Sequence, residues 1–152
     1  MSVGPIVDYI STGSGGADVV SVRSFYVASG SVAVGDFVAF SQPASGGGST
    51  LSYVKAASIS GTGPYLVGVA LQAGTFSSGS LIQVQVGGPC DANVSSSVSS
   101  APALIGPSAT AGRAAGTFVA SGSADLYPVG LALDAGSNSA LTPVFLFNLL
   151  LS

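Results

Sequence analysis

The stretch YLVGVALQAG at residues 65–74 returns as YPVGLALDAG at residues 127–136, with seven of the ten positions identical at an offset of 62. An internal repeat of this kind indicates a supersecondary unit that buries its apolar face only against a partner unit. Short apolar runs between glycine-rich turns are typical of strands. The repeat therefore predicts a fold built from two copies of one β-module.

The rest of the 152-residue chain also favours strands over helices. Glu is absent and Lys, Arg and Met are almost absent, whereas Gly, Ser, Val and Thr dominate. We expect an all-β fold, a small β-barrel or sandwich with glycine-rich turns. The apolar runs predict strands at residues 19–27, 36–40, 51–57, 65–71, 81–86, 103–105, 116–120, 127–133 and 143–149.

The chain is expected to form a single compact unit with three parts. Residues 1–30 would form an extended N-terminal arm and first strand, residues 31–90 the first β-module, and residues 91–152 the second. The serine-rich residues 92–100 would connect the modules. Residues 41–49, rich in Gly and Ser, predict an exposed loop.

The repeat extends on both sides of its best-matching core. Upstream, residues 38–40 align with residues 103–105, and downstream, residues 81–85 align with residues 143–147. One face of the downstream strand is apolar in both copies and is predicted to be core: Ile82, Val84, Val144 and Leu146.

The opposite face of that strand differs between the copies. It carries Gln83 and Gln85 in the first copy but Phe145 and Phe147 in the second, so the glutamines are expected to face water. Two interpretations of the phenylalanines remain open. They cover the amino-terminal segment of the same chain, or they form a subunit interface, because large apolar patches rarely stay uncovered.

Two glycines lie inside predicted strands, at equivalent positions of the repeat. Gly68 and Gly130 would weaken strand pairing unless a bend, a bulge or a close backbone approach requires them. Pro128 can donate no ladder hydrogen bond, which places it at an edge or at the start of a strand.

Charge is scarce throughout the chain. Only 6% of the residues are charged, against 47% hydrophobic, and the net charge is −3. A surface of Ser, Thr, Gly and Ala has little like-charge repulsion to keep copies apart, so we expect the protein to belong to an assembly. Three cationic residues are too few to bind phosphates, and nucleic acid is not an expected partner.

The ionisable residues predict no catalytic site. With no His, there is no imidazole base or imidazole metal ligand, and the aspartates are scattered singly. Lys55 is interpreted as a solvated strand lysine, and Asp36 and Asp134 as turn residues. Cys90 is expected to be a small buried hydrophobe near a strand end. We therefore expect no enzyme, no metal and no cofactor.

Membrane insertion and secretion are not expected either. The longest apolar tract, residues 143–151, is far shorter than the roughly 20 residues of a spanning helix. No basic segment precedes an apolar run at the start of the sequence, so no signal peptide is predicted.

The N-terminal arm is a candidate contact segment. Its apolar residues precede the glycines at positions 13, 15 and 16 and could add a strand to a neighbour's sheet. The alternative is an ordinary first strand of the same domain. The candidate contact residues for a capsid or a subunit are Val3, Pro5, Ile6, Val7, Tyr9, Ile10, Phe145 and Phe147.

Several of these motifs together resemble those of a known family. A Val34-Gly35-Asp36 turn opens a strand, Val67–Gly74 ends in an Ala-Gly turn, and residues 81–88 alternate before ending in Gly-Gly. Residues 107–112 and the second Val-Gly-Leu-Ala-Leu repeat the pattern. Over roughly residues 32–148 the chain resembles the small capsid decoration, or cement, proteins of tailed bacteriophages.

The resemblance implies a structural virion protein. Such a protein would be made in the host cytoplasm and bind the major capsid protein on the outer capsid surface, as a homo-oligomer and most often a trimer. It would stabilise the head without catalysis. The alternative is a tail, spike or fibre component, or a glycan-binding β-module on a particle surface, although the absence of Trp disfavours glycan binding.

Overall fold

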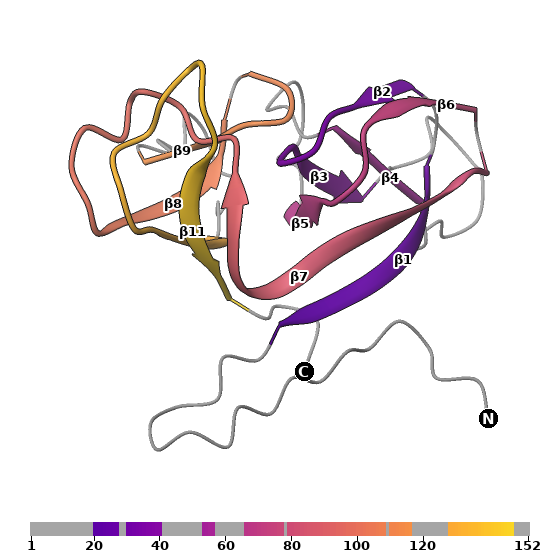
Figure 1. Ribbon diagram of the computed structural model, residues 1–152, viewed down its shortest axis with the longest axis horizontal. Coiled ribbons are helices and arrows are strands. Elements are labelled where there is room, and N and C mark those ends of the chain that lie inside the picture. Colours follow the sequence, from indigo (N-terminus) through magenta and orange to yellow (C-terminus); the bar gives the residue numbers. More distant parts are fainter. Residues whose placement is uncertain are drawn as a thin grey trace, which may run out of the picture.

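The structure is a computed structural model, and it describes residues 20–27, 30–40, 53–56, 66–77, 79–108, 110–116 and 128–147 (Figure 1). Within these ranges the chain forms strands and no helix, which confirms the predicted all-β class for this part of the chain. The strands are β1 (Ser21–Val27), β2 (Gly30–Val32), β3 (Phe37–Phe40), β4 (Tyr53–Ala56), β5 (Leu66–Ala70), β6 (Gly74–Phe76), β7 (Leu81–Ala92), β8 (Ala103–Pro107), β9 (Ala114–Ala115), β10 (Gly130–Ala132) and β11 (Thr142–Leu146).

Most of the predicted strands are present, with shifted ends. The unpredicted strands β2, β6 and β9 have three residues or fewer, too short for a hydrophobic pattern to develop. The strand predicted at residues 116–120 lies outside the described residues apart from Gly116, which forms a bend. The loop predicted at residues 41–49 also lies outside them.

Five strands of the first half pair into a ring. β1 pairs with β4, β4 with β3, β3 with β5 and β5 with β7, and β7 pairs with β1 again. The β1–β4 pairing is parallel and the other four are antiparallel. β2 and β6 form a separate two-stranded antiparallel sheet. Because the ring closes on itself, these strands present no long unpaired edge.

The strand β7 continues from this ring into the second half of the chain. Its last residues pair with β11, which is followed by β10, β8 and β9, all antiparallel. Just after β7, Val94 forms a parallel bridge with Ala114 of β9. Figure 1 shows β7 bending between the two groups of strands. The outcome is a nearly closed, barrel-like sheet in which one twelve-residue strand belongs to both halves.

β7 changes partners at the segment Gly87, Gly88 and Pro89: Gly87 pairs with β1, whereas Gly88 and Pro89 pair with β11. Gly88 has a φ of 85°, a left-handed conformation that glycine adopts without steric cost. The buried Gln85 side chain braces the bend: its Nε2 donates to the Gly87 carbonyl at 3.1 Å and to the Pro89 carbonyl at 2.7 Å. Two predictions are therefore wrong, because β7 does not end at residue 86 and Gln85 does not face water.

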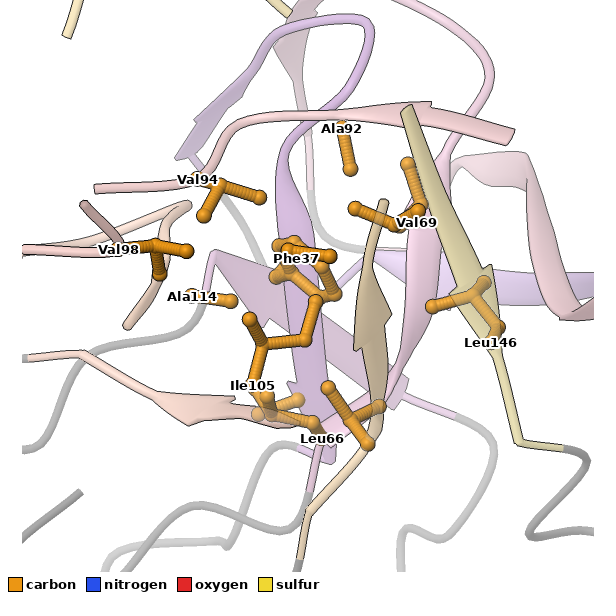
Figure 2. Packing of buried hydrophobic residues seen from close by; sticks show 13 residues of the cluster. Phe37, Leu66, Val69, Ala92, Val94, Val98, Ile105, Ala114 and Leu146 are labelled. Carbon is orange, nitrogen blue, oxygen red and sulfur yellow. The ribbon is translucent and has the colours of Figure 1, made fainter. Parts of the chain in front are cut away.

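Two clusters of buried apolar side chains fill the fold. One belongs to the first half and contains Phe25, Val32, Val38, Val67, Ala70, Ile82, Val84 and Val86. The other joins the halves and contains Phe37, Ala39, Leu66, Val69, Ala92, Val94, Val98, Ile105, Ala114, Val129, Ala132, Val144 and Leu146. Figure 2 shows Phe37 in the middle of this shared cluster, with Ile105 and Val69 close to it.

The strands β3 and β5 are buried on both faces. Successive side chains of a strand point to opposite faces, and in β3 Phe37 and Ala39 join the shared cluster while Val38 joins the first-half cluster. In β5, Leu66 and Val69 join the shared cluster. The second half therefore packs against the outer faces of β3 and β5.

The two copies of the repeated stretch occupy corresponding places in the sheet. β5 lies between β3 and β7, β10 lies between β8 and β11, and all these pairings are antiparallel. Gly68 pairs with Val38, and Gly130 pairs with Ile105. Val38 thus corresponds to Ile105, and the predicted alignment of Val38 with Ala103 is wrong by two residues.

The other side of the repeat shows a shift of the same size. Ala70 pairs with Val84, and Ala132 pairs with Val144, so the offset there is 60 rather than the predicted 62. A shift of two residues keeps every side chain on its face, because faces alternate with a period of two. The predicted core face is accordingly confirmed: Ile82, Val84, Val144 and Leu146 are all buried.

The two mid-strand glycines meet the backbone of the neighbouring strand. A Cβ on Gly68 would clash with the carbonyl oxygen of Gln85, and a Cβ on Gly130 would clash with that of Phe145. Of the three causes expected for these glycines, a close backbone approach is present at both positions, and the register of β3 against β5 also shifts beside Gly68. Pro128 belongs to no strand and lies two residues before β10 begins, close to the edge or strand start expected for it.

Candidate interaction surface

The ionisable residues form no reactive cluster in the part of the chain that the structure describes. No group of three or more His, Cys, Asp or Glu side chains gathers there in a way that could hold a metal ion. Among the same residues, no helix has the length and apolar character needed to span a membrane. Several ionisable side chains instead bind the chain's own backbone.

Asp36 joins a turn to the second half of the chain. Its Oδ2 accepts a hydrogen bond from the Ala33 backbone N at 2.8 Å, and its Oδ1 accepts one from Asn93 Nδ2 at 2.7 Å. Beside it, the Phe37 backbone N donates to the Gly112 carbonyl at 2.9 Å. The predicted turn role of Asp36 is confirmed, and the structure adds a link between the halves.

Arg113 and Asp134 also have local structural roles. The Arg113 guanidinium donates from Nη1 to the Ser137 carbonyl at 3.2 Å and from Nη2 to the Asn138 carbonyl at 2.7 Å. The Asp134 Oδ1 accepts from the Ala135 backbone N at 2.7 Å, which confirms its place as a turn residue. Both side chains hold loops of the second half.

Cys90 lies near the end of β7 and packs against the shared cluster. Burial, and secondarily the negative charge of Asp91, raise the pKa of the Cys90 thiol from 9.0 to about 12. The thiol therefore keeps its proton at neutral pH, and the thiolate is the nucleophilic form. Its packing agrees with the predicted role of a small hydrophobe, although the side chain is only partly buried.

The outer face of the second half carries a row of apolar side chains that we call the outer stripe. It consists of Leu104, Leu131, Phe145 and Pro89, which lie on β8, β10, β11 and β7. In register, Leu104 lies opposite Leu131, Leu131 opposite Phe145, and Phe145 opposite Pro89. Leu104 is 49% exposed and Phe145 38% exposed. Four adjacent strands thus present one apolar side chain each.

Exposed apolar residues and two exposed aspartates flank the outer stripe. Leu133, 49% exposed, follows β10 and donates its backbone N to the Pro143 carbonyl at 2.9 Å. Pro143 is exposed and lies opposite the exposed Asp91, and the exposed Asp134 follows Leu133. Exposed apolar side chains bordered by polar ones are typical of a docking site.

The two predicted contact residues of this region lie close together in sequence but differ in exposure. Phe145 is exposed and belongs to the outer stripe, whereas Phe147, just past β11, is half-buried and donates its backbone N to the Val129 carbonyl at 2.9 Å. The other candidates lie outside the described residues: Val3, Pro5, Ile6, Val7, Tyr9 and Ile10. Both interpretations of the phenylalanines stay predictions.

Leu104 and Leu131 are part of this surface, and the sequence gives no separate signal for them. Leu131 stands where the first copy has Val69, which is fully buried. Both residues are apolar, so the pattern cannot distinguish a covered position from an open one. The register of the sheet makes the distinction, because it places Leu131 between Leu104 and Phe145.

Comparison with protein-family models and with curated proteins found no match to this chain. The resemblance to phage decoration proteins therefore rests on the residues that carry it, and the function is argued from the surface.

Proposed function

We propose that this chain is a structural virion protein that binds the outer surface of an assembled phage capsid and stabilises it, as cement or decoration proteins do. It acts without catalysis and needs no cofactor. Its partners are the major capsid protein and other copies of itself, with a trimer as the expected form. It is made in the host cytoplasm and ends on the outer capsid surface.

One observation carries this proposal: the outer stripe is an uncharged apolar row across four strands, in which Leu104 and Phe145 are exposed and Leu131 and Pro89 are half-buried. Such a surface binds by shape and by burial of apolar area, which contributes roughly 25 cal/mol per Å². On an icosahedral shell, weak contacts of this kind are multiplied by symmetry, so modest individual contacts suffice for firm attachment.

We further propose that residues 31–90 and 91–152 are two copies of one β-module, with residues 1–30 as an arm and first strand. The matching strand orders β3–β5–β7 and β8–β10–β11 support this division. So do the glycines at corresponding positions, each of which approaches a carbonyl of the next strand. A duplicated module offers two related surfaces, one for the partner module and one for docking.

The proposal is tested by electron microscopy of particles that lack the protein, imaged before and after the purified protein is added. Regular density over the head lattice, together with DNA retention to a higher temperature, is the expected result. Density confined to the tail would favour the tail, spike or fibre alternative. Particles that acquire no density at saturating protein would contradict capsid binding altogether.

A further inference from the structure

The two halves of the molecule differ in one respect that the proposed function does not explain: the equivalent face of the sheet is buried in the first half and partly exposed in the second. By strand pairing, Gly68 with Val38 corresponds to Gly130 with Ile105, so the neighbours Phe37 and Leu104 occupy equivalent positions. In β5 and β10, Val69 is equivalent to Leu131 by the offset of 62.

The third strand completes this correspondence. Val69 pairs with Gln85 on β7, and Leu131 pairs with Phe145 on β11. The outer stripe residues Leu104, Leu131 and Phe145 are therefore the counterparts of Phe37, Val69 and Gln85 in the first half.

The first-half counterparts of the stripe are covered. Phe37 and Val69 are 0% exposed and Gln85 is 5% exposed. Phe37 and Val69 pack in the shared cluster, where Ile105 and Leu146 come from the inner face of the second half (Figure 2). Inside one molecule, this face is thus covered by a β-module of the same chain.

We infer that the outer stripe is covered in the same way, by another copy of this chain. The chain itself provides the precedent, because its second half covers the equivalent face of the first half. No charged side chain belongs to the stripe, and the nearest carboxylate in register, Asp91, lies beyond it, opposite Pro143. Two copies that meet at the stripe therefore bury no charge there. An apolar row can pack against the same row of a second copy in a two-fold contact, or against another apolar surface of it in a ring such as a trimer.

The inference rests on the self-association within the proposed function and does not depend on capsid binding. The inference assigns the central contact to Phe145 and Leu104, whose exposed side chains would be removed from water on docking. A carboxylate at either position would be buried unpaired against the partner subunit, which opposes association.

The test is the mass of the purified full chain in solution, measured by light scattering or sedimentation across a concentration series. Wild type is expected to form a closed oligomer. Phe145→Glu is expected to raise the dissociation constant at least about thirtyfold, as loss of a central hot spot does. The matched control is Leu81→Glu, which changes a leucine of the first half that is 56% exposed and should leave the mass unchanged.

Leu104→Glu provides a second variant if Phe145→Glu fails to fold, which circular dichroism and the urea midpoint reveal. A monomeric wild type at high concentration overturns the inference, whether the stripe then faces a segment of its own chain or water. A folded Phe145→Glu with wild-type mass also overturns it.

Particle binding distinguishes this inference from the proposed function. If the wild type forms oligomers and Phe145→Glu dissociates them, the inference is supported. If that same wild type does not bind particles, the capsid role is contradicted. Variants that keep the wild-type mass but lose particle binding would assign the stripe to the shell and overturn the inference.

Discussion

The carboxylate of Asp36 accepts a 2.7 Å hydrogen bond from the side-chain amide of Asn93, a residue 57 positions later in the chain. The same carboxylate caps the turn that opens β3, through the Ala33 backbone N. The Asn93 backbone N in turn donates to the Gly35 carbonyl at 2.8 Å. One short turn of the first half is therefore held to the segment that leaves β7 for the second half.

Asp36→Ala is expected to lower the free energy of unfolding by about 2 kcal/mol, because hydrogen bonds to a charged group contribute about 1.5–3 kcal/mol. Urea unfolding measures it. Asp134→Ala is the matched control, since that exposed carboxylate accepts a hydrogen bond from its chain neighbour Ala135, and we expect a change within about 0.5 kcal/mol. A double-mutant cycle with Asn93→Ala should give a coupling energy of at least about 0.5 kcal/mol. Additive effects would contradict the link.

Gln85→Met is expected to destabilise the fold by about 2 kcal/mol. It removes the donor of two carbonyls, Gly87 and Pro89, at the bend of β7, and a buried acceptor without a partner costs about 1–3 kcal/mol. Gln83→Met makes the same chemical change two residues away, at an exposed position, and should stay within about 0.5 kcal/mol. Equal shifts in thermal midpoint for the two variants would refute a bracing role for Gln85.

Gly68→Ala and Gly130→Ala should each cost at least about 2 kcal/mol, because the new Cβ meets a backbone carbonyl of the adjacent strand that cannot move aside. Gly79→Ala is the control that measures the cost of a left-handed backbone conformation without a steric clash. Gly79 has a φ of 88° but open space around it, so only the left-handed penalty of about 1 kcal/mol is expected. Denaturant midpoints of the three variants decide the order, and a larger loss at Gly79 would contradict it.

The sequence predicts which face of a strand points into the core, but it does not predict how the two halves of the chain pack on each other. Alternation within residues 81–85 and 143–147 correctly placed Ile82, Val84, Val144 and Leu146 inside, because a shift of two residues does not change a face. The sequence predicts that Gln85 faces water, because polar residues are mostly exposed. The carbonyls at Gly87 and Pro89 satisfy it internally, and only the bend brings them within reach.

The Gly87-Gly88-Pro89 segment predicts the end of a strand, because glycine and proline usually interrupt strands. In the structure β7 continues through them to Ala92 because the strand changes partners there, from β1 and β5 to β11. The change of pairing partner depends on strands from both halves of the chain, so no local sequence pattern predicts it. The sequence predicts only part of the outer stripe for a similar reason: Phe145 stands out against Gln83, its counterpart at the offset of 62, whereas Leu131 resembles the buried Val69.

Labelling of Cys90 by a thiol reagent at pH 8 is expected to be far slower in the folded protein than in urea. Burial raises the pKa of the Cys90 thiol to about 12, so the thiolate fraction should fall on the order of a thousandfold relative to an ordinary cysteine. Cys90 is the single cysteine of the chain, so the rate reports on it alone. Equal rates in the folded and unfolded states would contradict the burial of this thiol.

The same pKa shift predicts how stability changes in alkali. Above pH 9 the unfolded chain releases the Cys90 proton while the folded protein keeps it up to about pH 12. The folded state then binds more protons, and the free energy of unfolding falls as the pH rises through this window. Below pH 9 both states hold the proton, and this group makes no pH-dependent contribution. Cys90→Ala should remove that part of the decline in urea unfolding between pH 9 and 11, since alanine does not ionise. An unchanged slope in the variant would mean that the alkaline loss of stability comes from other groups.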